Sequence, residues 1–147
     1  MKVIAIASIG GHWIQLLRLK KAFAKCEVEF ISTDSSFATM VSGHNFHVIT
    51  EANRKNVFGL FKAFFEVYRI VAKVKPNLII TTGAAPGLMG LIAGKINGSK
   101  TIWVDSIANV EKLSMSGRIA SKFADRTYTQ WADLATDKLI YAGNILS

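Results

Sequence analysis

Short and almost uninterrupted runs of apolar residues recur along the chain, and longer segments with a different spacing separate them. A strand that is buried on both faces of a sheet produces such a run, because successive side chains point to opposite faces and both faces exclude water. Residues 3–7 are a clear instance of this pattern. The predicted strands are residues 3–7, 27–32, 46–50, 78–82, 101–105, 126–129 and 139–141.

The segments between the runs have helical character. Leu16, Leu19 and Phe23 follow the first run at the spacing of one helical face. Further helices are predicted at residues 56–73, after the loop 83–87 up to about residue 96, and at about residues 117–123. Strands that alternate with helices in this way form a parallel sheet. The expected fold class is therefore α/β, with a Rossmann-like parallel sheet and helices on both of its faces.

The chain has 147 residues, which is the length of one ordinary domain, so residues 1–147 are expected to form a single domain. Hydrophobic residues make up 50% of the sequence and charged residues 19%, a composition typical of a globular protein. The formal net charge of +8 predicts attraction to nucleic acid, phosphorylated lipid or an anionic membrane. Nucleic-acid binding is disfavoured, because Lys and Arg are spread over the predicted helices without interleaved exposed aromatic residues.

Cys26 is the only cysteine of the sequence, which excludes an intrachain disulfide, a CxxC redox pair and a Cys-rich zinc site; no metal site is expected. The apolar run at residues 3–7 is short for a signal peptide and is followed by Gly10 instead of a cleavage site. No stretch reaches the about 20 apolar residues that a bilayer span requires. We therefore expect no signal peptide and no transmembrane helix.

Three polar or glycine-containing loops follow predicted strands, at residues 8–12, 82–87 and 105–109. Open α/β sheets bind ligands beyond the carboxyl ends of their strands. Gly10 and Gly11 allow the backbone to approach a ligand closely, and the next helix directs free N–H groups to the same point. A phosphate or diphosphate is the expected ligand, although the glycine pair is also compatible with a simple tight turn.

A dinucleotide-binding fingerprint is absent from the first of these loops. Residues 8–13 lack the first and third glycines of GxGxxG, although Asp34 follows the second predicted strand at about the spacing of a ribose-binding acid. Asp34 is therefore predicted to cap a turn or a helix. The sequence has no Walker A loop either, which disfavours a stand-alone nucleotide-binding enzyme.

His12 stands at the start of the helix that follows the first loop. An imidazole in this position can take a proton from an acceptor hydroxyl as a general base, or donate a hydrogen bond to a phosphate. The alternative is a helix-start residue that bonds only to the backbone. The neighbouring phosphate loop favours the functional role. His44 and His47 lie in an irregular stretch and are assigned no role.

The predicted helix at residues 56–73 has an unusually wide apolar face. Basic residues and Glu66 form one narrow strip, whereas apolar residues cover far more than the ~100° that is usual for a surface helix. Neighbouring helices would account for this width if they cover it. The functional interpretation is docking at a membrane interface, with aromatic rings in the headgroup region and basic residues near anionic lipid. The docking residues are predicted to be Phe58, Phe61, Lys62, Phe65 and Arg69.

A series of motifs from near the start to near the end of the chain resembles one known family. The motifs are Ser8-Ile9-Gly10-Gly11-His12, PNLIITTGAAPG at 76–87, LSMSGR at 113–118, Ala124-Asp125, Gln130-Trp131 and Tyr141-Ala142-Gly143. In this order they resemble the acceptor-binding, membrane-recruiting subunit of the two-component UDP-N-acetylglucosamine transferase of the dolichol pathway. They also resemble its bacterial exopolysaccharide and capsule homologues of the PssD, CpsF and EpsE type. The Gly-Gly-His loop alone is shared with MurG-like transferases.

The resemblance implies the N-terminal half of a GT-B glycosyltransferase that is divided between two chains. This chain is then expected to bind a lipid-diphosphate-linked saccharide and to carry no cofactor of its own, while a catalytic partner chain binds the UDP-sugar donor. The implied location is the cytoplasmic face of the membrane, with peripheral attachment. Eukaryotic relatives usually carry an N-terminal membrane helix that this sequence lacks, which favours a bacterial-type member. Asp105-Ser106 stands where many relatives have Glu-Ser.

The three loops supply the predicted site. Contacts to the acceptor and its phosphates are expected from Ser8, Gly10, Gly11, His12, Thr82, Gly83, Ala84, Pro86, Gly87, Ser106 and Asn109. Inverting transfer needs a base near the acceptor hydroxyl, and His12 is the first candidate and Asp105 the second. Two alternatives stay open: a noncatalytic scaffold that brings the catalytic chain to the membrane, and a stand-alone nucleotide-binding enzyme. The phosphate loop argues against a pure scaffold.

Overall fold

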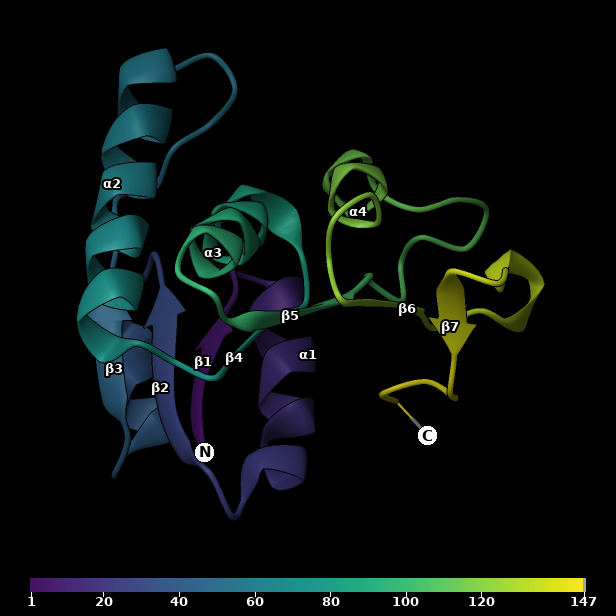
Figure 1. Ribbon diagram of the computed structural model, residues 1–147, viewed down its shortest axis with the longest axis horizontal. Coiled ribbons are helices and arrows are strands. Elements are labelled where there is room, and N and C mark those ends of the chain that lie inside the picture. Colours follow the sequence, from purple (N-terminus) through teal and green to yellow (C-terminus); the bar gives the residue numbers. More distant parts are fainter. Residues whose placement is uncertain (147) are drawn as a thin grey trace.

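The computed structural model describes residues 1–146, in which seven parallel strands form one sheet (Figure 1). The strands are β1 (Lys2–Ile6), β2 (Glu27–Ser32), β3 (Asn45–Val48), β4 (Leu78–Thr81), β5 (Lys100–Val104), β6 (Arg126–Thr129) and β7 (Leu139–Tyr141). Their order in the sheet is β3-β2-β1-β4-β5-β6-β7, and every neighbouring pair is parallel. All the predicted strands are confirmed, with ends shifted by at most two residues.

Helical segments connect the strands. The α-helices are α1 (Gly11–Arg18), α2 (Val57–Val74), α3 (Ala84–Ile96) and α4 (Met115–Ala120). The 3₁₀ segments are η1 (Leu19–Phe23), η2 (Ser35–Val41) and η3 (Ala132–Leu134). The first predicted helix continues from α1 into η1, and α4 begins two residues before its predicted start. Asp34 caps η2 by accepting a hydrogen bond from the Ser36 amide, which confirms its predicted capping role.

Helices cover both faces of the sheet. The residues of β1 alternate between two hydrophobic clusters: Val3 and Ala5 pack with α1 and η1, whereas Ile4 and Ile6 pack with α2, α3 and α4. Figure 1 shows α2 and α3 on one side of the sheet and α1 on the other. Because both faces are covered, the central strands need apolar residues at every position. The expected Rossmann-like architecture is confirmed.

The chain reverses its direction of travel across the sheet between β3 and β4. Strand β1 therefore pairs with β2 on one side and with β4 on the other. Loops that leave the carboxyl ends of β1 and β4 turn to opposite faces and open a crevice between them, which is the usual ligand position in open α/β sheets. The loop to α1 and the loop to α3 meet at this point.

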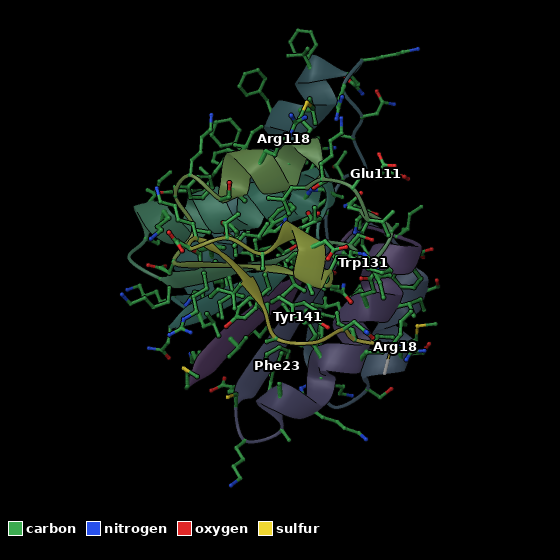
Figure 2. The ribbon with its side chains drawn as sticks, turned by 90° about the vertical axis from the view of Figure 1, so that its right-hand side faces the viewer. Arg18, Phe23, Glu111, Arg118, Trp131 and Tyr141 are labelled. Atoms are coloured by element: carbon green, nitrogen blue, oxygen red, sulfur yellow. The ribbon has the colours of Figure 1, made fainter. Side chains whose placement is uncertain are left out.

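A cavity of about 420 Å³ lies between η1 and residues 142–145, on the α1 side of the sheet. Its floor is apolar and includes Ile80, Ile102 and Val104. Figure 2 looks onto the β7 edge, with Phe23 and Arg18 of this lining below Tyr141. The cavity lies away from the reversal point, and none of the loops 8–12, 82–87 and 105–109 lines it.

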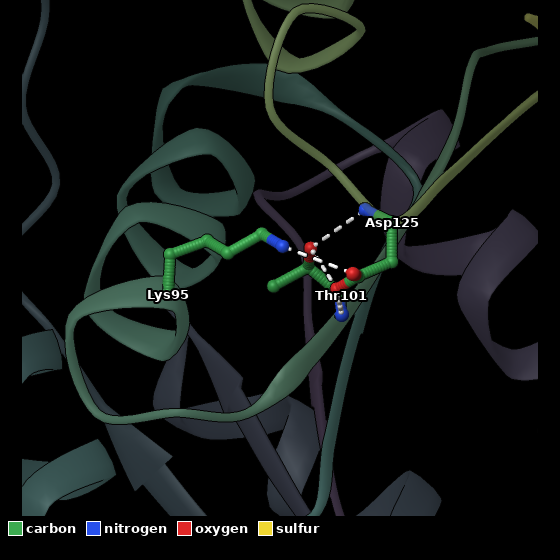
Figure 3. A network of polar contacts seen from close by, with 3 residues as sticks. All are labelled: Lys95, Thr101 and Asp125. Atoms are coloured by element: carbon green, nitrogen blue, oxygen red, sulfur yellow. Dashed lines mark hydrogen bonds and ion pairs between the residues drawn. The ribbon is translucent and has the colours of Figure 1, made fainter.

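A polar network ties the end of α3 to the amino ends of β5 and β6, on the side of the sheet away from the crevice (Figure 3). Lys95 Nζ lies 3.0 Å from Asp125 Oδ1, and the amide and hydroxyl of Thr101 donate to Asp125 Oδ2. Burial raises the pKa of Asp125, but the hydrogen bonds from Lys95 and Thr101 outweigh burial and hold that pKa below its ordinary value. Asp125, a residue of the motifs named above, therefore stabilises the fold through Lys95 and Thr101 and lies away from the crevice.

Candidate functional site

A polar cavity of about 380 Å³ opens at the carboxyl edge of the sheet, beside the reversal point. All three loops predicted from the sequence contribute to its wall, together with two segments that were not predicted, at Arg54 and at residues 114–116. The lining residues are His12, Arg54, Ala84, Ala85, Ser106, Ala108, Asn109, Ser114, Met115 and Ser116. The lining contains hydroxyls, an amide, an imidazole and a guanidinium but no carboxylate, so the wall is suited to an anionic or hydroxylated ligand.

Two hydrogen bonds connect His12 to the β4–α3 loop. His12 Nδ1 lies 2.9 Å from the carbonyl oxygen of Thr82, and Thr82 Oγ1 donates to the carbonyl oxygen of His12 at 2.6 Å. A carbonyl can only accept, so Nδ1 must carry a proton. In the neutral imidazole, Nε2 then holds the free lone pair. The loop thereby fixes both the orientation and the tautomer that a general base needs.

Gly83 leaves the space that the His12 ring occupies. A Cβ at Gly83 would lie 2.7 Å from both Cε1 and Nδ1 of His12. The backbone of Gly83 also has a φ of +132°, which L side chains rarely adopt. The next residue, Ala84, has a φ of +65° and is strained for a non-glycine residue. The tight turn after β4 is therefore shaped around the imidazole.

Asp105 is 2% exposed and accepts four hydrogen bonds. Its Oδ1 accepts from Trp103 Nε1 at 2.9 Å and from Ser114 Oγ at 2.8 Å. Its Oδ2 accepts from Asn109 Nδ2 at 2.9 Å and from the Ser114 amide at 3.1 Å. Both oxygens are occupied by donors from β5 and from the loop that follows it, so Asp105 is less free than His12 to take a proton from a ligand. Asp105 instead holds the wall formed by Asn109 and Ser114.

Two buried glutamines support the same wall from behind. Gln15 Nε2 donates to Ser106 Oγ at 3.1 Å, and Gln130 Nε2 donates to Gln15 Oε1 at 2.7 Å. Ser106 Oγ also accepts from the Ala108 amide at 3.2 Å. Because its acceptor capacity is used by these two donors, the Ser106 hydroxyl hydrogen is available to a ligand in the cavity. Ser106 is thus a ready donor.

Only some of the predicted acceptor-binding residues line the cavity. His12, Ala84, Ser106 and Asn109 line the cavity, and Thr82 and Gly83 lie directly behind the His12 ring. The other predicted acceptor-binding residues outside the lining are Ser8, Gly10, Gly11, Pro86 and Gly87. Gly87 has a packing role, since a Cβ there would overlap Thr81 Oγ1. It allows α3 to lie close to β4.

Sequence reasoning missed Arg54, Gln15 and Ser116 as site residues. Arg54 lies in the loop after β3, and any loop that follows a parallel strand reaches the same edge of the sheet. That rule would have included it. Gln15 is only 5% exposed and lies between the buried residues Trp13 and Leu16 of the same helix. A polar residue at a core position was the available signal.

Comparison with known proteins identifies the family. The family described as "Oligosaccharide biosynthesis protein Alg14 like" matches residues 46–145, which is more than half of the chain. The chain belongs to this family. The membership confirms the resemblance inferred from the motifs.

Relatives of this Alg14-like chain extend beyond the matched region. The "UDP-N-acetylglucosamine transferase subunit ALG14" of Mus musculus is 25% identical over 185 residues, covering 99% of this chain and 83% of the relative. The Schizosaccharomyces pombe subunit of the same name is 40% identical over 68 residues, or 42% of this chain. The first alignment includes the segment that carries His12.

Solved structures share the fold. The MurG structure from Acinetobacter baumannii has a TM-score of 0.79 with 16% identity, and the match covers 97% of this chain but 46% of MurG. The S. aureus MnaA–UDP structure has a TM-score of 0.73 with 14% identity, covering 98% of this chain and 44% of that one. The Alg14-like chain therefore spans about half the length of these solved chains.

The Alg14-like chain also carries an exposed aromatic surface on α2. The small residues Gly59 and Ala63 face the core, as do Val67 and Val71. Phe64 and Tyr68 are half-buried, so neighbouring elements account for part of the wide apolar face. Three rings stay exposed to solvent: Phe58 at 89%, Phe61 at 62% and Phe65 at 62%. Lys62 and Arg69 are exposed on the same helix. No helix among residues 1–146 has the length and hydropathy to cross a bilayer.

Proposed function

We propose that this chain is the acceptor-binding subunit of a two-chain, UDP-sugar-dependent glycosyltransferase that acts on a lipid-diphosphate-linked saccharide. The main support is the polar cavity, whose wall contains His12 and no carboxylate. The carbonyl oxygen of Thr82 holds His12 Nδ1 and leaves Nε2 free. The mouse relative is by name a UDP-N-acetylglucosamine transferase subunit. A Staphylococcus epidermidis relative, 24% identical over 139 residues, is by name a transferase acting on a pyrophosphoryl-undecaprenol substrate. Both names support this class of reaction.

His12 acts as the general base in the proposed reaction. Nε2 takes the proton of the acceptor hydroxyl while that oxygen attacks the anomeric carbon of the donor sugar. The bond from the anomeric carbon to the diphosphate oxygen breaks, and UDP leaves with its electron pair. Ser106 donates its hydroxyl hydrogen to the bound acceptor, and Asp105 positions Asn109 and Ser114. General-base assistance of this kind contributes about 10²- to 10⁴-fold to a rate.

The donor site belongs to a partner chain in this proposal. The mouse relative is by name one subunit of a UDP-N-acetylglucosamine transferase, and the fold match covers 46% of the MurG chain; both support a donor site on another chain. The partner's sugar-nucleotide site would face the cavity across the carboxyl edge of the sheet. No nucleic acid and no cofactor of this chain's own enters the reaction.

Activity is therefore expected only from the assembled pair. The purified chain, given UDP-N-acetylglucosamine and a short-prenyl diphosphate saccharide, should release no UDP above background, and addition of its co-expressed partner should start release together with formation of a lengthened product. UDP release and product mass spectrometry measure both events. Turnover by the single chain would contradict the division of the enzyme between two chains.

The exposed aromatic surface of α2 is proposed to place this site at the cytoplasmic face of a membrane by peripheral attachment. A crossover helix runs antiparallel to the strands, so α2 begins at the carboxyl edge where the cavity opens. Phe58, Phe61 and Phe65 would enter the headgroup region, while Lys62 and Arg69 attract anionic lipid. Docking in this orientation would bring the cavity to the lipid-linked acceptor.

Vesicle co-sedimentation tests this orientation. Binding of the complex should require anionic lipid and weaken with salt, and Phe58→Ser should lower the partition constant about five- to tenfold, because a ring is withdrawn from the interface. Ile96→Ser is the matched control, since Ile96 is 61% exposed but is the last residue of α3. It therefore lies at the amino edge of the sheet, whereas Phe58 lies at the carboxyl edge. Equal losses from both variants, or no binding by the wild-type complex, would rule out docking through α2.

A further inference from the structure

Arg54 is a charged residue of the cavity wall without a protein partner. It lies in the loop between β3 and α2 and lines the cavity together with His12. Within residues 1–146, the ion pairs are His47–Glu29 and Lys95–Asp125, and Arg54 has no hydrogen bond to another described residue. Arg54 is exposed, so packing in the core does not account for it either.

The lining of the cavity offers Arg54 no counter-charge. The cavity wall contains no Asp or Glu. Asp105, which supports the wall, is 2% exposed and already accepts four hydrogen bonds from Trp103, Asn109 and Ser114. A guanidinium presents several N–H groups in a planar fork that matches two oxygens of one phosphate or carboxylate. An arginine left in this state at a cavity mouth is suited to an oxyanion supplied by the ligand.

We propose that Arg54 binds the diphosphate of the lipid-linked acceptor and thereby sets the position of the acceptor hydroxyl relative to His12. This inference rests on the proposed transferase function and adds the residue that recognises the charged part of the substrate. The loop of Arg54 leads directly into α2, where Phe58 is 89% exposed. A lipid chain that leaves the membrane beside this end of α2 would present its diphosphate to Arg54 before its saccharide reaches the cavity.

The donor also contains a diphosphate, and kinetics can separate the two sources. The wild-type complex is assayed with UDP-N-acetylglucosamine and a water-soluble short-prenyl diphosphate saccharide, so that membrane binding does not contribute. Arg54→Ala should raise KM for the acceptor about 10- to 100-fold, as expected for loss of hydrogen bonds to a charged group. KM for the UDP-sugar and the melting temperature should stay unchanged. Arg54→Lys should recover only part of the loss, because an ammonium lacks the fork.

Lys55→Ala is the matched control, because it removes the same charge from the adjacent position of the same loop but does not line the cavity. A second acceptor that carries the saccharide without phosphates completes the comparison: Arg54→Ala should cause no further loss with it. A rise in KM for the UDP-sugar instead of the acceptor would assign Arg54 to the donor and overturn the proposal. Equal effects of Arg54→Ala and Lys55→Ala would reduce it to general charge attraction.

The outcome is separable from the proposed function itself. If the wild-type complex transfers sugar and His12→Ala is inactive while Arg54→Ala retains its KM for the acceptor, the transferase function stands and the role of Arg54 is wrong. If the wild-type complex transfers no sugar to any lipid-diphosphate acceptor, the proposed function fails first.

Discussion

Replacing His12 by alanine is expected to lower the turnover of the two-chain transferase by about 10²- to 10⁴-fold, with fold and assembly preserved. The imidazole is half-buried and makes its side-chain hydrogen bond to one carbonyl oxygen, that of Thr82. Losing this bond should cost only about 1 kcal/mol of stability. The effect should therefore be concentrated in kcat, which steady-state kinetics with a soluble acceptor measures.

A second variant tests the same imidazole without removing it. Gly83→Ala would place a Cβ within 2.7 Å of the ring and displace it, so its kcat should fall as well although the histidine is still present. His47→Gln is the control, because His47 lies on the edge strand β3, pairs with Glu29 of β2 and does not line the cavity. Wild-type turnover in His12→Ala would remove the catalytic role and favour the noncatalytic scaffold hypothesis.

The sheet was predictable because burial on both faces leaves a strong mark in the sequence. The strand at residues 27–32 is the clearest case: five of its six residues are buried and its predicted bounds are the observed ones. The short segments η2 and η3 were not predicted. They are short 3₁₀ segments of seven and three residues, of which η2 buries only Val41 and η3 buries none. Such segments produce no extended periodic apolar face.

The cavity was only partly predictable from loop position. Glycines and strand ends indicated His12 and Ser106, and these residues line the cavity. Arg54 was overlooked as a site residue because no glycine or motif marks its loop. The sequence also cannot tell whether a carboxylate has free lone pairs. Asp105 therefore looked like a second base, whereas the fold surrounds it with donors from residues 103, 109 and 114.

The wide apolar face of α2 contained two signals that the sequence alone could not separate. Small residues, Gly59 and Ala63, mark the side that packs closely in the core. Aromatic residues dominate the periodicity, but three of their rings lie on the solvent side. Side-chain size, read together with hydrophobicity, would have divided the helix correctly. The large exposed rings are the part for which membrane docking is proposed.

Asp105→Ala is expected to destabilise the chain by about 3–5 kcal/mol and to lower its melting temperature by about 10 °C. The substitution leaves four buried or half-buried donors without their acceptor, on Trp103, Asn109 and Ser114. It also frees the N-terminus of α4, because Ser114 Oγ caps that helix at the Gly117 amide. Thermal unfolding followed by circular dichroism measures the loss, and Asp137→Ala, at an exposed carboxylate, is the control.

Asp105→Asn separates the positioning role from a catalytic one. An asparagine amide at Oδ2 would face two N–H donors, whereas at Oδ1 it would face one N–H donor, Trp103 Nε1, and a Ser114 hydroxyl that can turn to accept. The second orientation is therefore preferred, and about half of the destabilisation should return. If Asp105 positions Asn109 and Ser114, activity should follow stability across the series of aspartate, asparagine and alanine. If Asp105 were the base, the asparagine variant would melt like the wild type and still lose turnover as completely as His12→Ala, and that pattern would reverse the roles assigned to the two residues.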